Sequence, residues 1–311
     1  MRHHDLGYLR PIAACMVSVL TVGFAMVAGF AIAGEGDAEA ENIGEMTFGE
    51  RKMMAIAEKQ EAIFRQFESK EGELSEMDVE ELQFRVRTLA QEYESLIADD
   101  PDEVLVYILY GKLLRKVGQE ERAAKMFLKA DDLDPKIAVV KQQLGNYLAE
   151  HGKFTEALGF LLQATTLSPE TAVYHYQIGE LLNVFRDSFI ADGLYLRGSL
   201  DSQMKAAFAE SARLAPGNRD FRLRFAECFY DLENPDWEES LALWGELMAG
   251  AESDHEQQAI HLHEANVLIK LARYEEAREH IEQVTLAVLA PTQNELLDQL
   301  PDAEEKLKAA E

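Results

Sequence analysis

Four residues in the last third of the chain have side chains suited to metal binding: His255, His261, His263 and Glu264. Imidazole nitrogens and carboxylate oxygens are ligands that zinc takes in proteins. His261 and His263, however, lie two positions apart, and side chains two apart on a helix do not face each other. We therefore expect solvated or packing histidines, no metal site and no cofactor.

Sequence motifs for catalysis are missing as well. The chain has no Gly-x-Ser-x-Gly nucleophile motif, no glycine-rich phosphate loop and no pair of closely spaced cysteines. Of its two cysteines, Cys228 lies among Phe225, Ala226 and Phe229, which favours a buried packing role over a reactive thiol. We expect a protein that is not an enzyme, and an enzyme accessory is the less favoured alternative.

An internal repeat predicts the helices that position side chains in this chain. The segment ADDLDP at 130–135 returns 34 residues later as ATTLSP at 164–169. A fixed period of this length is typical of stacked helical hairpins. Small residues stand where the two helices meet, a glycine ends the first helix and a proline follows the second: Gly111, Ala123, Gly118 and Pro135 in one copy, and Gly145, Ala157, Gly152 and Pro169 in the next.

On these residues the chain resembles a tetratricopeptide-repeat (TPR) protein. The resemblance implies an all-α fold, a right-handed α-solenoid of stacked helical hairpins. Looser copies contain Gly179, Ala226 and Ala265 at the small first-helix position, so that about five repeats follow a leading half-repeat. The third copy holds 13 residues more than the period allows, between Leu182 and Met204.

The chain divides into five expected parts. They are a signal peptide or N-terminal membrane anchor at 1–33, an acidic flexible linker at 34–45, an N-terminal helical cap at 46–79, the TPR array at 80–291 with an insertion near 186–203, and a C-terminal capping helix and tail at 292–311.

The amino-terminal part predicts an exported protein. Residues 11–33 are uncharged, Arg2 and Arg10 precede them, and an acidic segment follows, which orients the start toward the cytoplasm. Ala31 and Ala33 fit a signal-peptidase site, but 23 residues are also enough to span a bilayer uncut. Cleavage, an uncleaved anchor and a lipid-linked form at Cys15 stay open. We expect a periplasmic or extracytoplasmic location, with membrane contact only through 11–33 if that segment is uncleaved.

The charge of the chain restricts its partners. Its formal net charge is −27, and such an acidic body repels nucleic-acid phosphates. It favours solubility and basic partners. We therefore expect a protein or peptide partner and no nucleic acid.

The resemblance also implies where a partner binds, because the first helices of successive TPR hairpins line a groove. The polar and aromatic residues expected there run from a basic to an acidic end: Lys112, Arg115, Lys116, Gln142, Asn146, Tyr176, Glu180, Asn183, Glu227 and Tyr230. The carboxylate clamp of chaperone-binding relatives is missing, since Ile108, Gln143, Val173 and Gln177 occupy its places.

Two alternatives accompany the groove. The insertion, through Phe189, Tyr195 and Arg197, is either a loop that grips a partner or a segment that packs on the next repeat. The main function expected is a non-catalytic scaffold that binds a peptide or protein segment in the groove. The rival is a structural or assembly-factor subunit of a cell-envelope complex that uses its outer surface.

Overall fold

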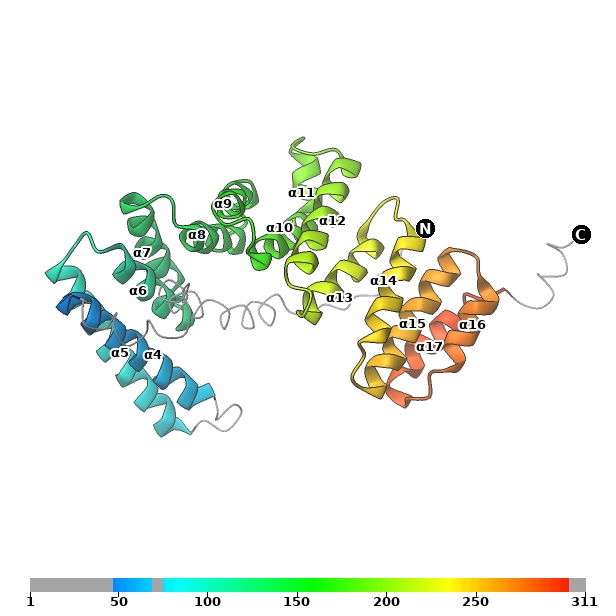
Figure 1. The fold of residues 1–311 in the computed structure, drawn as a ribbon, viewed down its shortest axis with the longest axis horizontal. Helices are drawn as coiled ribbons and strands as arrows, with labels where there is room; N and C mark the ends of the chain where they lie inside the picture. The colour runs from blue at the N-terminus through cyan, green and yellow to red at the C-terminus, as the bar shows by residue number, and fades with distance from the viewer. Residues whose placement is uncertain (1–46, 69–74, 302–311) are drawn as a thin grey trace, which may run out of the picture. The chain divides into compact units, whose positions relative to one another are not determined.

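The computed structural model describes residues 47–68 and 75–301, and within these ranges it is helical and without strands (Figure 1). The predicted all-α fold of stacked hairpins is therefore confirmed. The expected export segment at 1–33 and the linker at 34–45 lie outside the described residues. No helix within the described ranges is both long and apolar enough to cross a bilayer.

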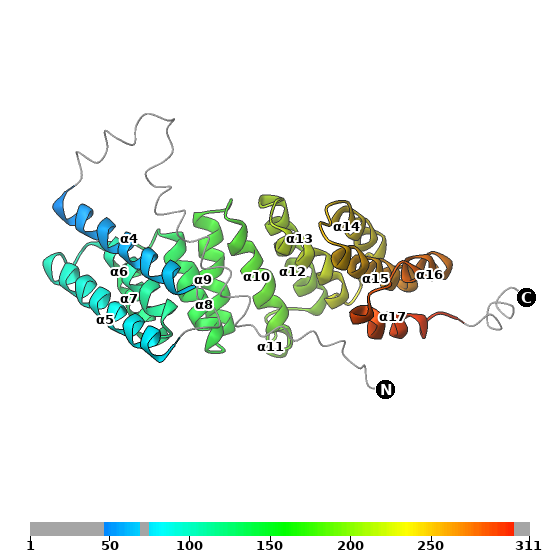
Figure 2. The ribbon, with the colours of Figure 1, turned by 90° about the horizontal axis from the view of Figure 1, so that it is seen from below.

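The described residues form two compact units, which divide between Leu144 and Gly145. In the first unit α4 packs along α5 and α6 packs on α7, as both views show (Figures 1 and 2). Its helices are α4 (Phe48–Glu68), α5 (Glu76–Asp99), α6 (Val104–Lys116), α7 (Glu120–Leu133) and the beginning of α8 (Ala138–Glu150).

The second unit begins inside α8 and continues as helical hairpins to residue 301. Within it α10 packs on α12, α14 on α15, and α15 on α16. Its elements are α9 (Phe154–Leu167), α10 (Ala172–Val184), α11 (Arg186–Ala191), α12 (Arg197–Leu214), α13 (Arg219–Glu227), the 3-10 helix η1 (Cys228–Asp231), α14 (Trp237–Ala249), α15 (Asp254–Lys270), α16 (Tyr274–Glu282), the 3-10 helix η2 (Ala287–Leu289) and α17 (Ala290–Leu297).

Glycines set the approach of the paired helices. A Cβ atom placed on Gly111 of α6 would lie 2.7 Å from the Phe127 ring of α7, and one on Gly179 of α10 would lie 2.6 Å from the Phe208 ring of α12. The sequence placed Ala123 opposite Gly111, but the nearest atoms belong to Phe127, one helical turn later. Gly111 and Gly179 therefore each receive an aromatic ring from the partner helix, whereas a Cβ atom on Gly145 of α8 would meet Leu161 at 3.0 Å.

The first helices end where the repeat predicts. Gly118 and Gly152 adopt left-handed backbone with φ of +73° and +72°, two residues beyond the ends of α6 and α8. Glycine takes this conformation without steric strain. At the corresponding place after α15 stands Ala272, with φ of +57°.

Two expected boundaries fall inside helices. The boundary at 79/80 lies within α5, because Ser75 starts that helix with a capping box in which its hydroxyl accepts from the amide N–H of Asp78. The boundary at 291/292 lies within α17, whose Leu296 is buried against the core of the last hairpin. Residues 302–311 of the expected tail lie outside the described part of the chain.

Cys228 has the expected packing role. It is fully buried in the same apolar cluster as Phe208 and Phe229. Burial raises the pKa of its thiol to about 12. The thiolate that reactive cysteines require is therefore disfavoured at neutral pH.

Candidate functional site

The basic positions of the expected groove lie on α6 in the first unit. Lys112 is half-buried, and this burial lowers the pKa of its ammonium group. Arg115 donates to Oε1 of Gln143 at 3.1 Å. Lys116 is exposed, and its Nζ lies 4.3 Å from the centre of the Phe64 ring. Lys116 therefore presents the most accessible charge of the three.

Several polar side chains of α8 are buried, and Gln142, Gln143 and Asn146 share one face of the helix. Lys141, Gln142 and Gln143 are 6%, 4% and 8% exposed, and Asn146, one turn after Gln142, is also buried. Nζ of Lys141 lies 2.7 Å from Oδ1 of Asp131, and the Gln143 amide donates to Oε1 of Gln142 at 2.7 Å. Apolar residues in place of buried ion pairs are often neutral or stabilising. Stability alone therefore does not account for the ion pair between Lys141 and Asp131.

In the second unit Tyr176, the first aromatic residue expected in the groove, is part of the core. Tyr176 of α10 is buried, and its ring stacks on Phe221 with centroids 4.8 Å apart. It also meets Phe208 edge-on at 5.8 Å. Most of this ring is thus covered by the fold itself.

The next two expected positions on α10 bind arginines. Oε1 of Glu180 accepts from Nε of Arg224 at 2.6 Å, and Oδ1 of Asn183 accepts from Nη2 of Arg186 at 2.9 Å. Arg224 also donates to Asp231 at 3.3 Å. Burial opposes the guanidinium charge, but the two carboxylates outweigh it and hold the pKa of Arg224 above its usual range. The acidic side chains of this face are therefore partly neutralised within the unit.

The last two expected positions, Glu227 and Tyr230, are half-buried. The Tyr230 hydroxyl lies 3.3 Å from Nδ1 of His263, and burial raises the pKa of this phenol. The His263 ring stacks on Trp244 with centroids 3.9 Å apart, and burial lowers the pKa of His263 to about 4. His263 of α15 thus packs as a neutral ring against Trp244 of α14.

The insertion is folded onto the second unit. Phe189 of α11 is fully buried and meets Phe154 edge-on at 4.7 Å, and Tyr195 meets Phe189 edge-on at 5.6 Å. Nε of Arg197 lies 3.0 and 3.1 Å from the two carboxylate oxygens of Asp201. These contacts favour the packing alternative. A partner-gripping role for the insertion stays a prediction.

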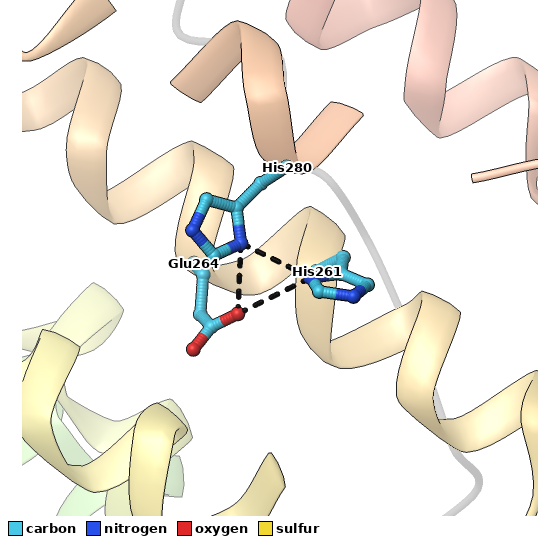
Figure 3. A group of neighbouring side chains, drawn as sticks. All are labelled: His261, Glu264 and His280. Atoms are coloured by element: carbon cyan, nitrogen blue, oxygen red, sulfur yellow. Dashed lines mark hydrogen bonds and ion pairs between the residues drawn. The ribbon is translucent and has the colours of Figure 1, made fainter. Parts of the chain in front are cut away.

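Among the described residues, three potential metal ligands come together between α15 and α16 (Figure 3). His261 and Glu264 come from one face of α15, and His280 reaches them from α16. Nδ1 of His261 lies 3.0 Å from Nδ1 of His280, and Oε2 of Glu264 lies 3.4 and 2.9 Å from these two nitrogens. Burial lowers the pKa of His261, while contact with the Glu264 carboxylate raises the pKa of His280.

The comparisons with known proteins support the repeat. Residues 104–137 match the family model for the tetratricopeptide repeat. No curated protein matches the chain. The matched tetratricopeptide repeat is the α6–α7 hairpin with its following turn, where the sequence analysis placed the first full copy.

The chain is also similar to several solved structures. YrrB, a TPR protein with an unusual peptide-binding site, is 18% identical, covers 71% of this chain and 98% of its own, and gives a TM-score of 0.51. Pseudomonas aeruginosa pilF is 16% identical over 79% of this chain and 99% of its own, with a TM-score of 0.49. MamA is 16% identical over 55% of this chain and 86% of its own, with a TM-score of 0.43. The likeness to YrrB supports an all-α array of tetratricopeptide-type hairpins.

The sequence analysis missed one residue of the histidine cluster. It considered His255, His261, His263 and Glu264, but His280 completes the group from the next helix. The spacing of His261 and Glu264, three apart on a helix, was the available signal that they share a face. The position of His280 depends on how α16 packs against α15. The residue spacing within one helix does not predict that packing.

Proposed function

We propose that the protein is a non-catalytic scaffold that binds an extended peptide or protein segment along the first helices of its hairpins. The observation that carries this proposal is the group of buried polar side chains on one face of α8, formed by Gln142, Gln143 and Asn146. The tetratricopeptide match and the hairpin fold support a protein or peptide as the partner.

The amide side chains of this face suit a polypeptide ligand. Amides both donate and accept hydrogen bonds, as an extended peptide backbone requires. Gln142 and Gln143 are held by each other, and Gln143 also accepts from Arg115, so little side-chain freedom remains to be lost on binding. The neighbouring Lys116 adds a positive charge. The first unit therefore favours a segment with acidic side chains.

A peptide selection tests the proposal. The purified protein is presented with a random peptide library, and the dissociation constant of each enriched peptide is measured by fluorescence anisotropy. Enriched peptides should be acidic at one end. Lys116→Glu on α6 should weaken their binding by about tenfold, which corresponds to about 1.4 kcal/mol.

The matched control is Lys125→Glu on α7. Lys125 is also exposed, and its reversal changes the net charge by the same amount but lies on the second helix of the hairpin. This variant should bind normally. Equal losses in the two variants, or a selection that enriches no peptide, would contradict the proposal.

Export of the scaffold is proposed on sequence grounds. The uncharged segment 11–33, with Arg2 and Arg10 before it, supports passage across a membrane. Mass spectrometry of the amino terminus in the native host tests this. A mature protein that starts after Ala33 indicates cleavage, and an intact Met1 in the membrane fraction indicates an anchor. An intact Met1 in the cytoplasm would contradict export.

A further inference from the structure

The cluster of His261, Glu264 and His280 brings three ligand atoms close enough together to hold one metal ion. The three closest ligand atoms form a triangle with sides of 3.0, 2.9 and 3.4 Å (Figure 3). Ligand atoms around a tetrahedral zinc ion, at about 2.0–2.1 Å from the metal, stand about 3.3 Å apart. A point about 2 Å from all three atoms therefore exists just above the plane of the triangle.

One oxygen in the cluster lacks a hydrogen bond. Oε2 of Glu264 is buried, and the Glu264 side chain is 9% exposed. Both imidazoles lie within ion-pair distance, yet this oxygen accepts no well-aligned hydrogen bond. A buried carboxylate oxygen without such a bond is destabilising. A cation above the triangle would satisfy it.

The two nitrogens point to the same conclusion. Nδ1 of His261 and Nδ1 of His280 are 3.0 Å apart, so at most one of them carries a proton along the line between them. At least one nitrogen therefore directs a lone pair toward the other ring. A metal ion accepts lone pairs from both nitrogens at once.

We infer that His261, Glu264 and His280 bind a divalent transition-metal ion, and that this ion is Zn²⁺. Two imidazole nitrogens and one carboxylate oxygen form a donor set that zinc accepts, whereas magnesium and calcium prefer oxygen ligands alone. The His261 and His280 side chains are 25% and 30% exposed, which leaves room for a water molecule as the fourth ligand. This inference does not depend on the proposed peptide binding.

The site is built on a rigid frame. Ala265 of α15 and Ala277 of α16 are fully buried in the core of this hairpin, which fixes the helices that carry the ligands. A zinc ion there would join α15 to α16 directly. Because the ion would bind only the folded hairpin, zinc binding should stabilise it.

Metal binding to the full-length chain tests the inference. The protein is stripped with EDTA, dialysed against limiting Zn²⁺ and analysed for bound metal, and its affinity is measured by competition with a chromophoric chelator. His280→Gln should lose one equivalent of zinc, or weaken that site by at least about tenfold. Co²⁺ in place of zinc should give the visible absorption of a four-coordinate site, and His280→Gln should abolish it.

His255→Gln is the matched control. His255 lies on the same α15 but is exposed and outside the cluster, so this variant should keep the zinc equivalent and the Co²⁺ spectrum. Added Zn²⁺, but not Mg²⁺, should raise the melting temperature of the parent and of His255→Gln, and leave His280→Gln unchanged. Equal zinc content and affinity in all three proteins, as from binding at His3 and His4, would overturn the inference. So would the absence of zinc binding by the parent chain.

Discussion

At the scale of single residues, the turns that follow the first helices of the hairpins require a positive φ, which glycine adopts more easily than alanine. Gly118 and Gly152 take positive φ without strain, but Ala272 stands in the corresponding turn with φ of +57°. A residue with a Cβ pays about 1–2 kcal/mol for this conformation. The turn is nevertheless formed, because Arg273 N donates to Leu268 O at 2.8 Å, as Gln119 N does to Leu114 O.

Ala272→Gly should therefore stabilise the protein. Relief of the left-handed strain exceeds the extra chain entropy of glycine in the unfolded state, and the net gain should be about 0.5–1 kcal/mol. In EDTA, to remove any metal effect, the melting temperature should rise by about 1–4 °C. Differential scanning calorimetry measures the shift.

A second alanine supplies the control. Ala242 is exposed in the middle of α14, where glycine lowers helix stability by about 1 kcal/mol. Ala242→Gly should thus shift the melting temperature downward. A decrease for both variants would show that the turn at Ala272 is not strained.

At the scale of elements, the sequence could predict the hairpins because their determinants are local. Gly111, Gly118 and Pro135 mark a helix contact, a helix end and a stop within one repeat. The short helix α11 could not be read in this way, since the burial of Phe189 depends on Phe154, 35 residues earlier. His280 was missed for the same reason. The burial of Phe189 and the position of His280 both depend on contacts between helices that are distant in sequence.

The predicted contact between paired helices can be tested at Gly179. A Cβ added there would meet three ring atoms of Phe208 at 2.6–2.8 Å. This ring is fully buried between Tyr176 and the Arg224 guanidinium, so it cannot move aside easily. Gly179→Ala should lower the free energy of unfolding by about 1–3 kcal/mol despite the better helix propensity of alanine. Urea titration followed by circular dichroism measures the change.

Gly159 of α9 is the comparison. No atom lies within 4 Å of a Cβ built there, and the residue is exposed in mid-helix. Gly159→Ala should therefore raise stability by about 0.5–1 kcal/mol. If both variants gain stability, the close approach of α10 to α12 is not a constraint.

At the scale of the whole molecule, charge is the dominant property. The chain has 57 acidic and 30 basic side chains. Even if every base paired with an acid, 27 carboxylates would lack a partner of opposite charge. Most of the ion pairs within the described residues, such as Lys52 with Asp99, are partly exposed and contribute little. Repulsion among the remaining carboxylates therefore opposes the folded state.

Salt should accordingly stabilise the protein at pH 7. The screening length falls from about 30 Å at 0.01 M to about 8 Å at 0.15 M ionic strength, which weakens repulsion between distant carboxylates more than attraction within close pairs. The melting temperature in EDTA should rise by a few degrees over this range of NaCl, on the order of 1 kcal/mol. Near the isoelectric point, about pH 4.6, the same salt step should have no stabilising effect, because the net charge approaches zero. A melting temperature that falls with NaCl at pH 7 would mean that the exposed ion pairs outweigh the repulsion of the acidic surface.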